Sequence, residues 1–247
     1  MTREKIQLLG IDFSNLDPER VAAWLAARDA AEPFGYVVTP NADHLVRLHR
    51  HPTMRRMYDG ASLSLLDSRV IATAARLLGL PAPCVCTGSD LVELLLCQHL
   101  RPGERITIVG LHPAHLPALC ARLGLAAPAH FYPPIGFWRD PVGLDAARRF
   151  VLEHPARFVL FALGSPGQEV LAHAIARSGG ATGMGLCIGA SLEFLAGAAT
   201  RAPRWMRQGG LEWLHRLMRE PRRLGRRYLL DDPLIFQLLL RERLQRS

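Results

Sequence analysis

Polar residues that can act on a substrate follow two of the apolar stretches in this chain. Asp67 comes after the stretch 62–66, and Thr39 and Asn41 come after the stretch 36–38. If these stretches are parallel strands of one sheet, the side chains lie where ligands bind, beyond the carboxyl ends of the strands. Asp67 is then placed to act as a general base that accepts a hydroxyl proton. Asp67 and Asn41 are also suited to cap the helices that follow them, and the sequence leaves both roles open.

A glycine-rich turn follows a third apolar stretch and leads into a predicted helix. Its candidate binding residues are Gly164, Pro166, Gln168 and Glu169. Free N–H groups and the helix dipole at such a turn form an anion site that suits a diphosphate. The alternative is that the turn only redirects the chain. The turn matches neither the GxGxxG pattern nor the P-loop.

Most of the positive charge lies in the last fifth of the chain. Residues 201–247 contain twelve arginines and five acidic residues, which gives +7 of the net charge of +8. This predicts an anionic partner, such as phosphates, a membrane surface or nucleic acid. Apolar residues recur there at helical spacing, and two tryptophans lie among them: Leu211, Leu214, Leu217 and Met218, with Trp205 and Trp213. Such a basic amphipathic segment is typical of membrane-surface binding, or it packs its apolar side on the protein itself.

These residues need a scaffold, and the rest of the chain predicts an α/β fold. Short apolar stretches alternate with helical patterns, which indicates a Rossmann-like, largely parallel sheet flanked by helices. We expect residues 1–200 to form the catalytic domain and residues 201–247 to form a basic helical appendage. The predicted strands are 6–9, 36–38, 62–66, 105–109, 129–132, 158–163 and 182–188.

Several other classes of protein are disfavoured. Five cysteines without a CxxC pair argue against a disulfide framework and a zinc site. The first residues lack the apolar run of a signal peptide, so we expect a cytoplasmic protein. The histidines have no third ligand at metal spacing, and we interpret them as surface or core residues. An Asp-x-Asp motif, the usual sign of a metal-bound nucleotide sugar, is absent.

Taken together, these motifs resemble those of the WecG/TagA/CpsF glycosyltransferases over roughly residues 5–230. The tail sequence GLEWLHRLMREPRRLGRRY is the most specific part of the resemblance. The matching segments are Thr39-Pro40-Asn41, Asp67-Ser68, Thr87-Gly88-Ser89-Asp90-Leu91, Gly164 to Glu169, and Arg201 to Tyr228.

The resemblance implies an inverting glycosyltransferase that needs neither a metal nor another cofactor. Such enzymes transfer a hexose or N-acetylhexosamine from a UDP-sugar to a saccharide on undecaprenyl diphosphate, in cell-surface or exopolysaccharide biosynthesis. The chain would be peripheral on the cytoplasmic face of the bacterial plasma membrane, touching its anionic surface through the appendage. Nucleic acid is not an expected partner, and the oligomeric state stays open.

The resemblance also assigns roles to individual residues. Asp67 would be the base, and the remaining motif residues would bind donor and acceptor: Thr39, Asn41, Thr87, Asp90, Gly164, Pro166, Gln168 and Glu169. Phosphates would be held by arginines of the tail, for which we name Arg201, Arg222, Arg223 and Arg227. Arginine suits this role, because its planar guanidinium group can form two hydrogen bonds to a phosphate.

The chain departs from the family pattern at two places. Ser68 replaces the glycine expected after Asp67, and Cys84-Val85-Cys86 stands where an arginine is expected. A family member that has lost its activity is therefore one alternative. A non-catalytic α/β protein that binds membranes or nucleic acid through its basic tail is another. A nucleotide-binding oxidoreductase is the third, and the missing GxGxxG motif argues against it.

Overall fold

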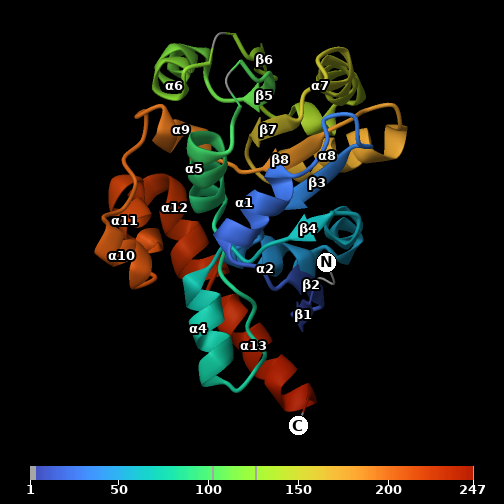
Figure 1. Ribbon diagram of the computed structural model, residues 1–247. Helices are drawn as coiled ribbons and strands as arrows, with labels where there is room; N and C mark the ends of the chain where they lie inside the picture. The colour runs from blue at the N-terminus through green and yellow to red at the C-terminus, as the bar shows by residue number, and fades with distance from the viewer. Residues whose placement is uncertain (1–3, 102, 126, 247) are drawn as a thin grey trace.

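The computed structural model describes residues 4–101, 103–125 and 127–246, and its centre is a six-stranded parallel sheet (Figure 1). The strand order is β4-β3-β8-β7-β5-β6, and every neighbouring pair is parallel. The strands are β3 (Gly35–Val38), β4 (Leu63–Ser64), β5 (Ile106–Gly110), β6 (Ala129–Phe131), β7 (Phe158–Ala162) and β8 (Met184–Cys187). The predicted α/β class is confirmed.

Helices cover both faces of this sheet, and each face has its own apolar core. In β3, Tyr36 and Val38 belong to one buried cluster and Val37 to the other, because successive strand side chains point to opposite faces. The helices before the tail are α1 (Pro18–Ala26), α2 (Ala42–Arg50), α3 (Arg56–Asp59), α4 (Arg69–Leu77), α5 (Gly88–Gln98), α6 (Leu116–Leu123), α7 (Pro141–Glu153), α8 (Gly167–Ser178) and α9 (Ser191–Leu195).

The N-terminal segment forms a hairpin outside the main sheet. The predicted strand 6–9 is β1 (Lys5–Leu8), and it pairs antiparallel with β2 (Ile11–Ser14), which the sequence reading did not predict. Leu9 and Gly10 connect the two with positive φ angles of 51° and 73°. Two-residue hairpins prefer such left-handed turns because they match the twist of the strands.

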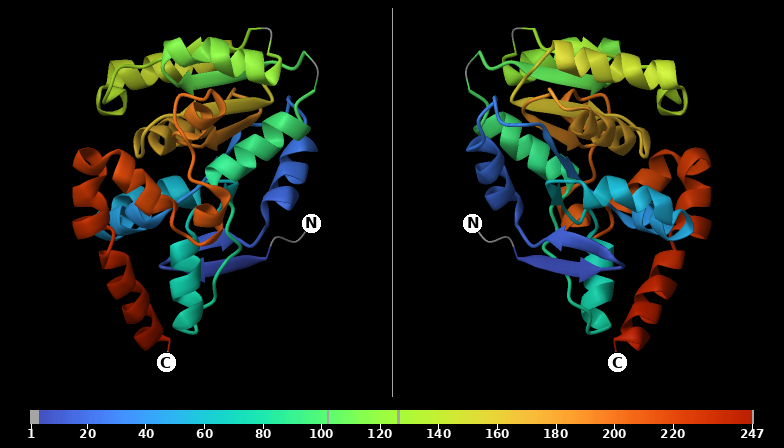
Figure 2. Two further views of the ribbon diagram at one scale, coloured as in Figure 1. Left: turned by 90° about the vertical axis from the view of Figure 1, so that its left-hand side faces the viewer. Right: turned by 90° about the vertical axis from the view of Figure 1, so that its right-hand side faces the viewer.

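The basic tail folds into short helices that lie against the body of the protein. They are α10 (Arg204–Gln208), α11 (Glu212–Arg219), α12 (Pro221–Arg226), a π-helical turn (Arg227–Asp231) and α13 (Leu234–Gln245). Ile235 and Leu239 of α13 are buried in the same apolar cluster as residues of the sheet. Figure 2 shows α13 beside α4 at one end of the molecule, and the two helices are in contact. Folding of residues 1–200 as a separate domain stays a prediction.

The helices are too short or too polar to span a bilayer. Across the three described ranges, none combines the length and the apolar character that a crossing requires.

Candidate active site

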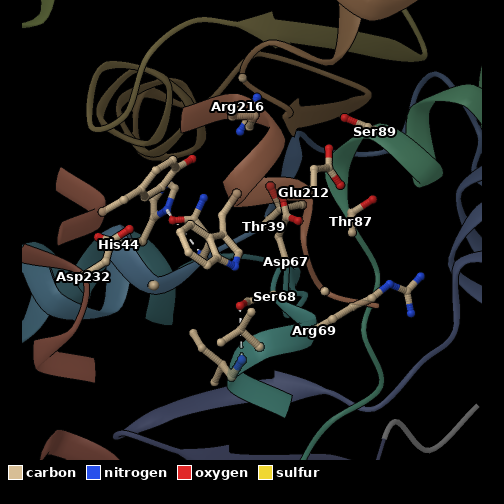
Figure 3. A pocket seen from close by; sticks show the side chains of 18 of the residues that line it. Thr39, His44, Asp67, Ser68, Arg69, Thr87, Ser89, Glu212, Arg216 and Asp232 are labelled. Carbon is tan, nitrogen blue, oxygen red and sulfur yellow. Dashed lines mark hydrogen bonds between the residues drawn. The ribbon is translucent and has the colours of Figure 1, made fainter. Parts of the chain in front are cut away.

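A cavity of about 410 Å³ lies at the carboxyl ends of β3, β4 and β8, and the tail forms one of its walls (Figure 3). The body contributes the polar residues Thr39, Asn41, His44, Asp67, Ser68, Arg69, Thr87, Ser89, Gln168 and Ser191. The tail contributes the polar or aromatic residues Arg207, Glu212, Trp213, Arg216, Arg227, Tyr228, Asp232 and Phe236. Residues far apart in the sequence therefore meet where parallel sheets bind ligands.

Asp67 faces this cavity and does not cap the next helix. Ser68 is the N-cap of α4, and its side-chain oxygen accepts a hydrogen bond of 3.2 Å from the backbone N–H of Ile71. The serine that departs from the expected Asp-Gly pattern thus takes the capping role. This leaves the partly buried Asp67 carboxylate available to a substrate.

The surroundings of Asp67 favour a carboxyl group that exchanges its proton near neutral pH. Burial raises the pKa of Asp67 to about 6, and the negative charge of Glu212 adds to this effect. Arg216, the Gly88 amide and His44 lower the pKa in part. A base with a pKa near the working pH combines a populated ionised form with useful proton affinity. The environment therefore fits the predicted role of Asp67.

The cavity floor is held by a polar network that runs from α2 to α8. The hydroxyl of Thr39 donates to the Cys187 carbonyl at 3.0 Å, and the carboxamide of Gln168 accepts from the Gly189 N–H at 2.9 Å. The Gln168 amide nitrogen also donates to the buried Glu169 carboxylate at 2.8 Å. These bonds fix Thr39 and Gln168 in orientation, which pre-organises the floor for a ligand.

His44 belongs to this network, although the sequence analysis interpreted it only as a surface or core histidine. Its Nδ1 atom lies 2.7 Å from Asn41 Oδ1, and its Nε2 atom lies 3.4 Å from Glu169 Oε1. Burial raises the pKa of Glu169, but hydrogen bonds from His44 and its other neighbours outweigh this and lower it overall. The spacing of three residues between Asn41 and His44 on one helical turn is the only sequence signal that links them.

The predicted phosphate turn lies beside the cavity rather than in its wall. Gly164, Pro166 and Glu169 are not among the lining residues, whereas Gln168 is. The N–H of Gly167 already bonds the Gly164 carbonyl at 2.9 Å, and the Glu169 carboxylate sits in the first turn of α8. A negative side chain and an occupied N–H group make this helix start a poor site for a diphosphate.

The four tail arginines named from the sequence occupy three different settings. Arg222 and Arg223 are exposed and do not line the cavity, and Arg223 pairs with Glu220. Arg201 bonds Asp90 at 2.7 Å outside the lining residues. Arg227 lines the cavity between two carboxylates, with Nε at 3.8 Å from Asp43 and 3.6 Å from Asp232.

Thr87 and Asp90 mark the start of α5 at the cavity rim. Thr87 lines the cavity and caps the helix, because its hydroxyl accepts from the Asp90 N–H at 3.0 Å. Asp90 is not among the lining residues, and its carboxylate instead pairs with Arg201 and Arg207.

Residues 6–247 match the model of the glycosyl transferase WecG/TagA/CpsF family. The chain belongs to this family. The matched residues include the tail, so residues 207–236, which form one wall of the cavity, are part of the family's sequence pattern. Family membership establishes a glycosyltransferase that serves cell-surface polysaccharide biosynthesis.

The cavity of this WecG/TagA/CpsF protein includes two tail residues that we did not single out from the sequence. Glu212 and Arg216 both lie on α11, both line the cavity, and the charges of both shift the pKa of Asp67. No carboxylate of the described chain lies within ion-pair distance of Arg216, whose guanidinium stacks on the Phe194 ring at 5.5 Å. Both residues lie in the tail motif that carried the resemblance, but spacing did not show which arginine faces inward.

The second departure from the family pattern also has a structural setting. Cys86 is fully buried, and Val85 forms a β-bridge with Leu66 beside Asp67. An arginine is expected in this segment, and here Arg69 of α4 lines the cavity instead. In the described parts of the chain, no three histidine, cysteine, aspartate or glutamate side chains are grouped to hold a metal ion.

Proposed function

We propose that this family member transfers a hexose or N-acetylhexosamine from a UDP-sugar to a saccharide on a polyprenyl diphosphate. The observation that carries the proposal is that one cavity holds both Asp67 and Arg216, a cation that has no ion-pair partner in the described chain. A sugar transfer with inversion needs a base for the acceptor hydroxyl and a positive group for the departing diphosphate. The cavity supplies both groups.

In this mechanism Asp67 removes the proton of the acceptor hydroxyl as its oxygen attacks the anomeric carbon of the donor. The bond between that carbon and the diphosphate oxygen breaks, so UDP leaves with the electron pair and the configuration inverts. A single displacement needs one carboxylate base and no covalent intermediate. Thr39, Asn41 and Gln168 would contact the sugars from the floor of the cavity.

The leaving diphosphate is best placed near Arg216. Two other tail arginines line the cavity, but both are already paired: Arg207 lies 3.3 Å from Asp90, and two carboxylates balance the charge of Arg227. The hydroxyls of Thr87 and Ser89 line the cavity at the start of α5, where the helix dipole favours an anion. This helix also has a carboxylate in its first turn, but Arg201 and Arg207 balance the charge of that residue, Asp90. We therefore assign neutralisation of the leaving group to Arg216 and the start of α5, and to no metal ion.

A UDP-release assay tests this function directly. The protein is given a panel of UDP-sugars and a short-chain polyprenyl-diphosphate saccharide, with EDTA present throughout. We expect acceptor-dependent UDP release with one donor, and the same rate with and without EDTA. If folded protein releases no UDP with the short-chain acceptor, the assay is repeated with the native lipid fraction as acceptor. Absence of UDP release in both assays would contradict the proposed function.

We further propose that the protein docks on an anionic membrane through α13. Phe236, Leu240 and Leu244 follow one another at four-residue spacing and are 48%, 50% and 69% exposed. The stripe predicted on α11 is less accessible, because Leu211, Leu214 and Leu217 are partly buried and only its fourth member, Met218, is exposed. Phe236 also lines the cavity, so the exposed face of α13 leads to the site. A lipid-linked acceptor could then enter from the bilayer side.

The double variant Leu240→Glu, Leu244→Glu tests this docking face. Full burial of a leucine contributes about 1.5–3 kcal/mol, so half-burial of two predicts roughly tenfold or more weaker binding to anionic vesicles. Vesicle flotation measures the loss. Ile135→Glu, Val142→Glu is the matched control, since both residues are exposed and Val142 lies on α7, which Figure 1 shows at the opposite end of the molecule from α13. Unchanged binding of the α13 variant would contradict the assignment.

A further inference from the structure

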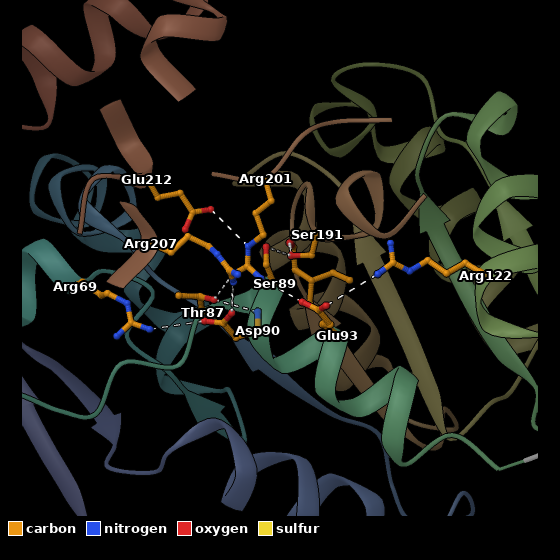
Figure 4. A network of polar contacts seen from close by, with 11 residues as sticks. Arg69, Thr87, Ser89, Asp90, Glu93, Arg122, Ser191, Arg201, Arg207 and Glu212 are labelled. Atoms are coloured by element: carbon orange, nitrogen blue, oxygen red, sulfur yellow. Dashed lines mark hydrogen bonds and ion pairs between the residues drawn. The ribbon is translucent and has the colours of Figure 1, made fainter. Parts of the chain in front are cut away.

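The first helix of the tail is attached to the body by a network of ion pairs around Asp90 (Figure 4). The Asp90 carboxylate lies 2.7 Å from Arg201 and 3.3 Å from Arg207, and Arg69 of α4 lies 4.0 Å away. Glu93 adds a longer contact of 3.4 Å to Arg201. Asp90 is therefore the one carboxylate of the described chain that pairs with both tail arginines.

The chain beyond this network turns directly onto α4. Gly210 has a φ of +73°, and a side chain at this position would meet Arg69 and Val70 at 3.6–3.7 Å. The turn at Gly210 is thus left-handed and closely packed on the start of α4, just after Asp67. Glycine adopts this conformation without strain. As a result, α11 begins beside the start of α4, directly after Asp67 in the body of the protein.

The same network reaches the cavity through Arg201. Its Nε atom lies 3.9 Å from the Glu212 carboxylate, which faces Asp67. Asp90 itself does not line the cavity. The contacts therefore run from Asp90 through Arg201 to Glu212 on α11, the helix that also carries Arg216. Both of these α11 residues influence the pKa of Asp67.

We propose that Asp90 is a positioning residue: by pairing with Arg201 and Arg207 it holds α10 and α11 in place, so that Glu212 and Arg216 face Asp67. The inference rests on the proposed function only for its effect on catalysis. The docking itself is a property of the fold. It gives the aspartate of the Thr-Gly-x-Asp motif a role in assembling the site instead of touching the substrate.

Hydrogen–deuterium exchange of the full-length protein tests the docking without any substrate. In Asp90→Asn we expect amides of residues 204–219 to exchange at least about tenfold faster than in wild type, because charge-assisted hydrogen bonds to both arginines are weakened. Arg201→Met removes the contacts from the tail side and should give the same pattern. Asp145→Asn is the matched control, since Asp145 pairs with two arginines on α7, outside the cavity lining.

The pH profile of kcat/KM provides the second readout. Asp67 is flanked by Glu212 and Arg216 from α11 and by His44 from α2. When the tail moves away, water reaches Asp67 and Glu212 leaves, so the acid limb in Asp90→Asn should shift from about pH 6 toward the ordinary aspartate value of about 4. The control variant should keep the wild-type midpoint.

Two outcomes separate this inference from the proposed function. Unchanged exchange at residues 204–219, or a raised KM with an unshifted pH midpoint, would overturn the inference and indicate direct substrate contact by Asp90. Faster exchange in a protein that releases no UDP with any donor would support the docking role and contradict the proposed transfer reaction.

Discussion

Replacement of Asp67 by asparagine is expected to abolish most of the transfer activity. Asparagine keeps the shape of the side chain but cannot accept the hydroxyl proton. General base catalysis typically contributes about 10²–10⁴-fold, and we expect a loss of that size in kcat. Binding of the UDP-sugar, measured by calorimetry, should stay close to the wild-type value. Turnover near the wild-type rate would show that another group is the base.

The stability of this variant distinguishes a chemical defect from a folding defect. The folded pKa of Asp67 is raised above its unfolded value, so its ionised form destabilises the fold. This cost develops as the pH rises from about 4 to about 6, and it is fully present at pH 7. Asp67→Asn should therefore melt at the same temperature as wild type or higher at pH 7.

The second large effect is expected from Arg216→Ala. Removal of one preorganised donor to a developing negative charge typically costs about 10²–10³-fold in kcat. Arg216 has no ion-pair partner in the described chain, so its loss breaks no salt bridge and leaves the α11 network with Arg201 intact. We expect weaker binding of UDP as well as slower turnover, both measurable with purified protein.

Arg219→Ala is the matched control for this prediction. Arg219 lies one turn further along α11, is exposed, and does not line the cavity. We expect it to retain turnover within about twofold, since surface charges distant from a site are largely screened. Equal losses in both variants would indicate that the overall charge of the tail matters rather than the guanidinium that faces the cavity.

Local sequence patterns were sufficient for the body of the fold. The predicted strands 105–109 and 158–163 correspond to β5 and β7, and Asp17 caps α1 where a capping residue precedes a helical pattern. These features depend on neighbours a few residues apart. The β1–β2 hairpin was not predicted, because its turn contains only Leu9 and Gly10, and leucine is not typical of a left-handed turn position.

The sequence also indicated Asp67, Thr39, Asn41 and Gln168 as site residues, since each follows a strand or begins a helix at the edge of the sheet. All four line the cavity. Their catalytic and binding roles remain predictions. The capping alternative for Asp67 could be rejected only from the structure, because Ser68 and Asp67 are both good capping residues and their dihedral angles decide which one caps.

The tail shows most clearly what the sequence by itself determined and what required the tertiary structure. Composition showed that residues 201–247 carry the positive charge, because charge is counted without coordinates. Which arginine is available to a ligand depends on where the carboxylates of other segments lie. Asp90 pairs with Arg201, Asp43 and Asp232 flank Arg227, and Arg216 is left facing Asp67. These pairings join residues far apart in the chain, and only the folded arrangement brings them within Coulombic range.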